Sequence, residues 1–172
     1  MNRRRFYAAP DAFAPDGAWV ELSREESAHL VNVLRLRVGD EAFVFDGAGR
    51  EFRCRVEEVR KSVRLACAEE VEPLRPESTL ALTLAVALLK GEKFDLVVQK
   101  ATELGVARIV PVVTARTDVR LRGGRESDAR VARWQRLALE AAKQSGRARV
   151  PAVGAPVEVS KLLTHEARAG AE

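Results

Sequence analysis

One stretch of the chain, residues 80–116, constrains the fold more than any other. An apolar run over 80–89, broken only by Thr83, leads into a polar turn at 90–93, and a second apolar run covers 106–113. Between the runs, apolar residues recur on one helical face, and a glycine follows where a helix C-cap favours positive φ. These positions are Phe94, Val97, Val98, Ala101, Leu104 and Gly105. The order predicts two neighbouring parallel strands joined by a helix.

Both strands of this unit are apolar on both faces, which is typical of a parallel sheet that helices cover on each side. The stretch therefore predicts an α/β domain, which we expect to span residues 79–172. Residues 73–78 contain two prolines and are expected to form a semi-rigid linker before it.

The first 72 residues have a different pattern. Residues 51–59 and 62–71 alternate between apolar and polar side chains, as half-buried strands do. Ser23 and Glu26 have the spacing of a capping box, which predicts a helix that runs to about Arg35. Residues 1–72 are therefore predicted to form a small antiparallel β-barrel with one helix.

Charge and apolar content narrow the function. The net charge is +4, the pI is about 9.4, and arginine dominates the cations, which suits either phosphate recognition or an ordinary ion-paired surface. The sequence has no apolar run of membrane-spanning length and no secretory signal at its start, so we expect a cytoplasmic protein. No histidines and cysteines cluster with metal-ligand spacing, and no metal is expected.

Cys54 and Cys67 lie in the two strands of a predicted hairpin and could stand nearly opposite one another. For a cytoplasmic chain we expect reduced thiols rather than a disulfide.

Several basic residues occupy positions suited to a polyanion. Arg3, Arg4 and Arg5 precede two aromatic residues, which could grip phosphate and stack on a base, or could simply become an edge strand. Ligands of open α/β sheets bind beyond the carboxyl ends of the strands. Basic residues follow the predicted strands or the long helix at Lys90, Lys93, Arg116, Arg147 and Arg149.

Motifs spread over most of the chain resemble the ribosomal RNA small-subunit methyltransferase E family. The most specific are KATELG within KGEKFDLVVQKATELGVARIVPV (90–112) and QSGR within EAAKQSGRARVP (140–151). The others are RRFY (4–7), HLVNVLRLRVGD (29–40), FDGAGREF (45–52) and RW (133–134).

The resemblance implies a PUA-like RNA-binding barrel followed by a SPOUT-class methyltransferase domain with a C-terminal trefoil knot. It implies S-adenosylmethionine as cofactor, a homodimer, and methylation of a 16S rRNA uridine at N3. The family's glycine-rich GPEGG-like segment, which forms the knot and most of the cofactor pocket, does not occur in these 172 residues. We therefore expect this chain not to hold the cofactor alone, and its sequence assigns no cofactor-binding residue.

Uridine N3 must lose a proton before it can attack a methyl donor, so a cation that stabilises the anion would help. By the resemblance, Arg147 and Gln144 are expected to line the pocket of the target base, with Arg116 as a further candidate. Arg147 could instead form an interface ion pair, and Gln144 could cap the helix. Arg3, Arg4, Arg5, Arg35, Arg37, Lys90 and Lys93 are the expected RNA contacts.

Two other functions are compatible with the residues. One is a non-catalytic RNA-binding chain. The other is a metabolic α/β enzyme acting on a phosphorylated small molecule, which has less support because the sequence contains no phosphate-binding glycine loop.

Overall fold

The computed structural model describes residues 3–115 and 124–169 of the chain, with side chains up to residue 164. The described residues form two compact units. The first unit comprises residues 1–77 and 142–150, and the second comprises residues 78–141 and 151–172.

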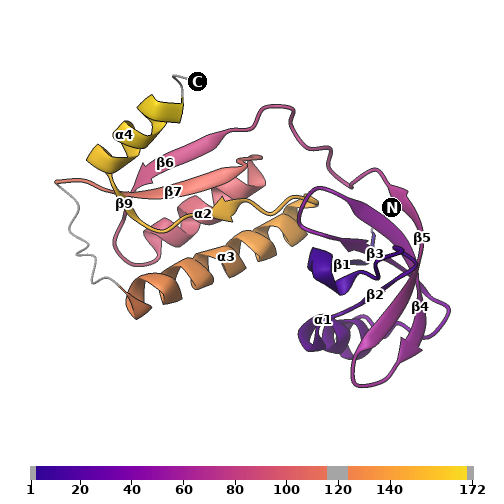
Figure 1. Ribbon diagram of the computed structural model, residues 1–172. Coiled ribbons are helices and arrows are strands. Elements are labelled where there is room, and N and C mark those ends of the chain that lie inside the picture. Colours follow the sequence, from indigo (N-terminus) through magenta and orange to yellow (C-terminus); the bar gives the residue numbers. More distant parts are fainter. Residues whose placement is uncertain (1–2, 116–123, 170–172) are drawn as a thin grey trace. The chain divides into compact units, whose positions relative to one another are not determined.

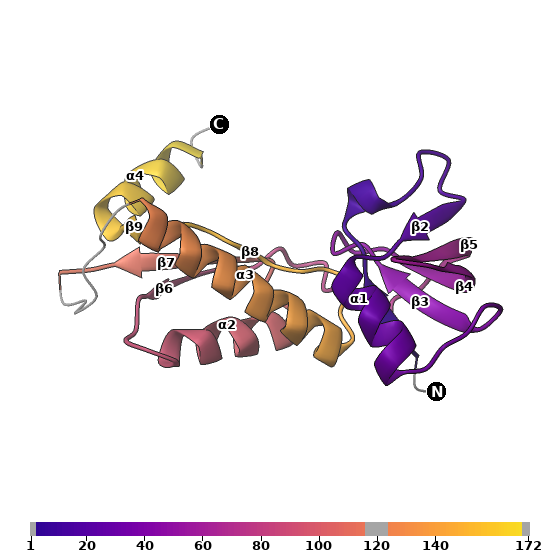
Figure 2. The same ribbon diagram turned by 90° about the horizontal axis from the view of Figure 1, so that it is seen from below.

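The first unit contains a five-stranded sheet in the order β1-β3-β4-β5-β2. Its strands are β1 (Arg5–Tyr7), β2 (Trp19–Glu21), β3 (Glu41–Phe45), β4 (Glu51–Val59) and β5 (Val63–Val71). Every pairing is antiparallel except that between β1 and β3, which is parallel and was not expected from the sequence. The sheet is curled, as Figure 2 shows, in agreement with the predicted PUA-like barrel.

Alternation along the strands gives this sheet two distinct faces. One face carries the core, in which Phe6, Val44, Val56 and Leu65 are almost completely buried. Residues with the opposite parity, such as Phe43 on β3 and Arg53 on β4, lie on the other face, because side chains alternate along a strand. We call this second side the outer face.

The predicted helix begins as expected, because the Ser23 side chain accepts a hydrogen bond from the Glu26 amide at 3.2 Å. Helix α1 (Arg24–Ala28) continues as a π-helical turn, η2 (His29–Val33), and a 3₁₀ turn, η1 (Pro10–Ala12), lies between β1 and β2. The helical segment buries Leu30 in the core, whereas Val33 stays 65% exposed. Arg35 then takes a positive φ of 52°, so the segment ends at about the predicted residue.

The second unit confirms the predicted strand–helix–strand arrangement. Strands β6 (Thr83–Ala87) and β7 (Arg108–Val113) are parallel neighbours, and α2 (Lys93–Glu103) connects them. Phe94, Val98 and Ala101 are buried along α2. Leu104 is 84% exposed and does not extend the buried stripe, because it is the C-cap residue beyond the end of the helix.

Three helices surround the second sheet. α2 and α3 (Arg125–Ser145) lie along one face, and α4 (Val159–Ala169) lies on the other side, as seen in Figure 1. The short strands β8 (Ala152–Val153) and β9 (Val157–Glu158) both pair with β7. The expectation of strands buried on both faces holds for β7 but is wrong for β6, where Thr83 and Ala85 are exposed. Within the described residues β6 has a partner on one side only, so fewer neighbours cover it.

The compact units differ from the two uninterrupted domains expected from the sequence. Residues 142–150, which include the last turn of α3, pack with the first unit rather than with the α/β unit that precedes them. No helix among the described residues is long and apolar enough to cross a membrane.

Candidate functional site

A cavity lies beyond the carboxyl end of β6, the location that the strand order predicts for a ligand. Its volume is about 330 Å³. We call it the β6-end pocket, and its lining residues are Leu88, Leu89, Lys90, Gly91, Asp95, Arg130, Arg133 and Trp134.

The loop after β6, the first turn of α2 and the first half of α3 each supply part of this lining.

Asp95 fixes the geometry of the β6-end pocket. Its carboxylate accepts a hydrogen bond from Trp134 Nε1 at 3.2 Å and forms an ion pair with Arg133. The Trp134 ring packs on Phe94 with their centroids 4.6 Å apart, and Trp134 is only 5% exposed. α2 and α3 are therefore held together by one carboxylate and two aromatic rings.

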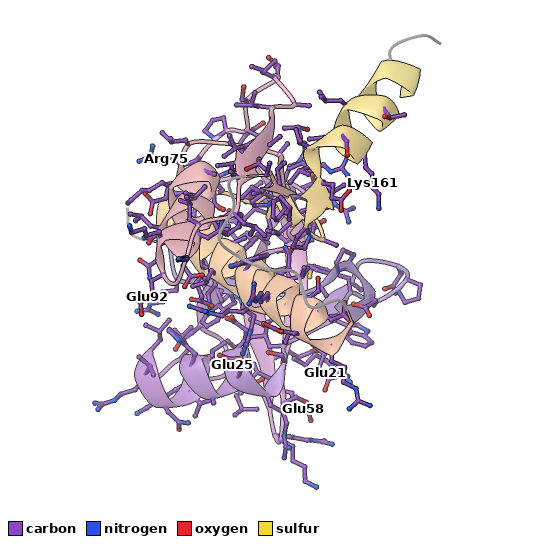
Figure 3. The ribbon with its side chains drawn as sticks, turned by 90° about the vertical axis from the view of Figure 1, so that its left-hand side faces the viewer. Glu21, Glu25, Glu58, Arg75, Glu92 and Lys161 are labelled. Carbon is purple, nitrogen blue, oxygen red and sulfur yellow. The ribbon has the colours of Figure 1, made fainter. Side chains whose placement is uncertain are left out.

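The lining of the β6-end pocket is mainly cationic. Lys90, Arg130 and Arg133 stand against the single carboxylate of Asp95. Arg130 also pairs with Glu126 on its own helix at 2.6 Å. Because arginine forks suit phosphate oxygens, the pocket can bind an anion. The sequence pointed to Lys90 here but missed both arginines, whose i, i+3 spacing on one helix face was the available signal. Lys93 is exposed at the start of α2 and is not part of the lining, and neighbouring Glu92 also lies at the surface (Figure 3).

A second cavity, of about 560 Å³, lies on the outer face of the first sheet. We call it the sheet-face pocket, and its lining residues are Arg3, Arg4, Glu41, Phe43, Arg53, Glu69 and Val71. The Arg3 guanidinium lies 4.8 Å from the centroid of the Phe43 ring, and Arg53 pairs with Glu69 at 2.9 Å. The pocket therefore combines cations, carboxylates and an aromatic ring, groups that can contact the phosphate and the base of a nucleotide.

The three N-terminal arginines, predicted together as RNA contacts, have different environments. Arg3 and Arg5 both pair with Glu51, whose side chain is completely buried, at 2.9 Å each. The Arg5 side chain is itself only 6% exposed. Arg4 is exposed and lines the sheet-face pocket. The structure thus gives Arg5 a structural role and leaves Arg4 the most accessible of the three.

Residues 142–150 are attached to the first unit by several polar contacts. Arg5 donates hydrogen bonds to the carbonyl oxygens of Lys143 and Arg147, at 3.3 and 3.0 Å. The Lys143 ammonium group binds Glu26 at 2.6 Å. The Val150 amide donates to the carbonyl oxygen of Gly47 at 2.9 Å. The family-like QSGR motif therefore lies in a segment that docks on the barrel.

The predicted target-base residues do not come together in one described cavity. Arg147 is 4% exposed, and its guanidinium binds Glu77 at 2.8 Å. That geometry favours the ion-pair alternative left open by the sequence, and Glu77 is the partner that sequence reasoning missed. Gln144 is exposed at the end of α3, and Arg116 lies outside the described residues.

Arg35 and Arg37 lie on an exposed loop of the first unit. The Arg37 amide donates a hydrogen bond to the Asp40 carboxylate at 2.8 Å, which holds the turn. Val33 and Val38, beside them, are 65% and 64% exposed. Both arginines are therefore accessible to a polyanion.

Glu103 is partly exposed on α2, where a hydrogen bond from Lys100 lowers the pKa of its carboxyl group. No group of three or more His, Cys, Asp or Glu among the described residues could hold a metal ion.

Comparison with known proteins identifies both parts of the chain. Residues 76–171 match the RNA methyltransferase domain, and residues 22–65 match the RNA methyltransferase PUA domain. The chain is 34% identical over 161 residues to "Ribosomal RNA small subunit methyltransferase E" of Synechocystis sp., covering 92% of this chain and 50% of that protein. It is also 34% identical to the protein of that name from Bacillus subtilis, covering 77% of this chain and 51% of the relative.

Solved structures of related proteins superpose on most of the chain. The enzyme of that name from Neisseria gonorrhoeae, bound to S-adenosyl methionine, superposes with a TM-score of 0.79 at 34% identity, covering 94% of this chain and 65% of that one. A putative methyltransferase of Legionella pneumophila in complex with the same cofactor gives a TM-score of 0.81 at 32% identity, covering 95% and 66%.

The chain spans about half the length of the curated relatives it matches first. The matched RNA methyltransferase domain nevertheless covers more than half of the chain, and the PUA domain lies within the first unit. The chain therefore belongs to the RNA methyltransferase family that includes the ribosomal RNA small subunit methyltransferases E.

Proposed function

We propose that this protein transfers a methyl group from S-adenosylmethionine to a uridine N3 in 16S ribosomal RNA. The observation that carries the proposal is the match of residues 76–171 to the RNA methyltransferase domain, next to a PUA domain. The names of the relatives supply the ribosomal substrate, and two solved relatives bind the cofactor. By the family resemblance, the protein would act as a homodimer in the cytoplasm.

The described residues do not assign a cofactor site. S-adenosylmethionine carries a sulfonium cation, whereas the β6-end pocket is lined by three cationic side chains and one carboxylate. Like charges in a confined site repel one another, so this pocket suits the phosphate of the RNA better than the methyl donor. These residues therefore contribute to RNA binding in the proposed function and not to the methyl donor's site.

In the proposed reaction, RNA binding uses both units. Arg4, Arg35 and Arg37 are the proposed phosphate contacts of the first unit, and Lys90, Lys93, Arg130 and Arg133 are those of the second. Each phosphate that these side chains neutralise releases bound counterions, so affinity should fall steeply with salt. Gln144 remains a proposed contact of the target base because its side chain is exposed, and we propose that Arg147 mainly holds its own segment in place.

The test is methylation of small ribosomal subunits that lack the modification. The protein is incubated with the subunits and S-adenosylmethionine carrying a labelled methyl group, and the modified nucleoside is identified by mass spectrometry. A methyl group at N3 blocks base pairing, so a reverse-transcriptase stop locates the nucleotide. The expected product is 3-methyluridine in 16S rRNA.

A labelled nucleoside other than 3-methyluridine would disprove the proposed site of methylation. Salt-sensitive RNA binding without any methyl transfer, under conditions in which a relative of the same family is active, would instead support the non-catalytic RNA-binding alternative.

A further inference from the structure

Two cysteines of the first unit face one another across a pair of antiparallel strands. Cys54 on β4 and Cys67 on β5 are direct partners in the strand register, and their Sγ atoms are 3.5 Å apart. Both are free thiols. Directly opposed residues of an antiparallel pair have Cα atoms about 4.5 or 5.5 Å apart. Both spacings lie within the range that a disulfide spans, so the backbone needs no rearrangement to link the two residues.

The two thiols differ in access and in hydrogen bonding. Cys54 is 1% exposed within the core, whereas Cys67 is only partly buried at the edge of that core. The Cys54 thiol donates its hydrogen bond to Cys67 Sγ. This bond lowers the pKa of Cys67 and, together with burial, raises the pKa of Cys54. An accessible thiol with more thiolate character thus stands next to a buried partner, which is the arrangement of an attacking and a resolving cysteine.

A local irregularity of the sheet lies beside the pair. The strand register shifts between Arg53 and Cys54, so β5 contains one more residue than β4 at this point. Such a bulge bends its strand and leaves a residue outside the hydrogen-bonded ladder. The extra residue is Ala68, the direct neighbour of Cys67, so the regular ladder is interrupted next to the cysteine that must move.

We propose that Cys54 and Cys67 form a reversible dithiol–disulfide modification site whose oxidant is a small hydroperoxide. The proposal goes beyond RNA methylation and does not depend on it. A small oxidant is required because Cys67 is only partly exposed.

The chemistry balances in two steps. The Cys67 thiolate first attacks one peroxide oxygen, the O–O bond breaks, and the departing hydroxide takes up a proton to become water. Cys67 is then a sulfenic acid. Cys54 sulfur next attacks Cys67 sulfur, the S–O bond breaks, and the departing hydroxide takes the Cys54 proton. In total two thiols lose two electrons and, with hydrogen peroxide as the oxidant, one peroxide is reduced to two water molecules.

The test exposes the full protein to hydrogen peroxide under native conditions and follows its intact mass and its free thiols. The expected result is a loss of two hydrogen atoms with both thiols consumed, and a linked pair of peptides containing Cys54 and Cys67 after digestion. Dithiothreitol should restore the starting mass and both thiols. The melting temperature of the oxidised protein should exceed that of the reduced protein, because the link constrains the unfolded chain.

Two variants and one control separate the roles. In Cys54→Ala the Cys67 sulfenic acid has no partner, so dimedone should trap it. The protein without substitutions should give little adduct. In Cys67→Ala the buried Cys54 should react many times more slowly. The same treatment of protein unfolded in urea measures how fast the link forms without the native geometry.

Three outcomes would overturn the proposal. One is accumulation of a dimedone adduct or a sulfinic acid at Cys67 of the protein without substitutions, with no linked peptide. Another is equal formation of the link in native and unfolded protein. A third is a linkage that joins two chains instead of Cys54 and Cys67 of one chain. The linked-peptide measurement needs no variant, so it decides the question even if a substitution prevents folding.

Discussion

At the scale of single residues, adjacent side chains of similar chemistry do different things. Arg5 is almost completely buried and binds the buried carboxylate of Glu51 and two backbone carbonyls. Arg4, one position earlier, is exposed. Removing Arg5 leaves the buried Glu51 carboxylate with Arg3 as its remaining ion-pair partner, and weakening a buried ion pair costs far more than losing an exposed charge.

We therefore expect Arg5→Ala to lower the free energy of unfolding by about 3 kcal/mol, within the usual cost of breaking a buried pair. Arg4→Ala should change it by less than about 0.5 kcal/mol. Urea unfolding followed by circular dichroism measures both. Similar losses of unfolding free energy for the two variants would show that the ion pair between Arg5 and Glu51 does not stabilise the fold.

At the scale of elements, α2 and α3 end at glycines with positive φ, yet the two ends differ in their surroundings. Gly105 has φ of 95° and open space where a side chain would lie. Gly146 has φ of 80°, and a Cβ atom there would lie 3.1 Å from Leu74 Cδ2 and 3.2 Å from Arg75 Cγ. The sequence predicted the helix end at Gly105, but no local pattern shows how the two ends differ, because the difference lies in the linker that packs beside Gly146.

Both Gly105→Ala and Gly146→Ala should be destabilising, since a left-handed conformation costs a non-glycine residue about 1–2 kcal/mol. We expect Gly146→Ala to cost more, because residues 74 and 75 must also move. Thermal unfolding of the two variants compares them. A larger drop in melting temperature for Gly105→Ala than for Gly146→Ala would contradict the packing of the linker against the end of α3.

The β6-end pocket is also a property of elements, because α3 presents Arg130 to it and Arg136 elsewhere. Arg130→Gln should weaken binding to ribosomal RNA and reduce the salt slope by about one contact. Arg136→Gln removes the same charge from an exposed position of the same helix, and should have a smaller effect. Filter binding over a salt series measures both. Equal effects would mean that the pocket has no specific role.

At the scale of the whole molecule, the docking of residues 142–150 on the first unit separates two roles for Arg147. A structural ion pair with Glu77 predicts that Arg147→Met lowers the free energy of unfolding by about 3 kcal/mol. Methyl transfer by the surviving folded protein should then be nearly unchanged. Unfolding and transfer are measured on the same preparation. A large loss of transfer with unchanged stability would instead restore Arg147 to the target-base pocket.

The sequence by itself determined the features that short-range patterns encode. These are the parallel unit around α2, the alternating strands β4 and β5, the capped helix α1, and the placement of Cys54 opposite Cys67. Periodicity specifies which face of an element is apolar, and that information is local. Motifs along most of the chain also indicated the family.

Only the tertiary structure decided which basic residues are available to a ligand. Glu51 is 46 residues from Arg5, and Glu77 is 70 residues from Arg147, so no local pattern reveals either pair. The arginines of α3 and the loop after β6 likewise meet only in the folded unit. An arginine has a structural role when the fold buries a carboxylate from a distant part of the chain beside it, because a buried charge must be paired. An arginine without such a buried partner stays at the surface and is available to a ligand.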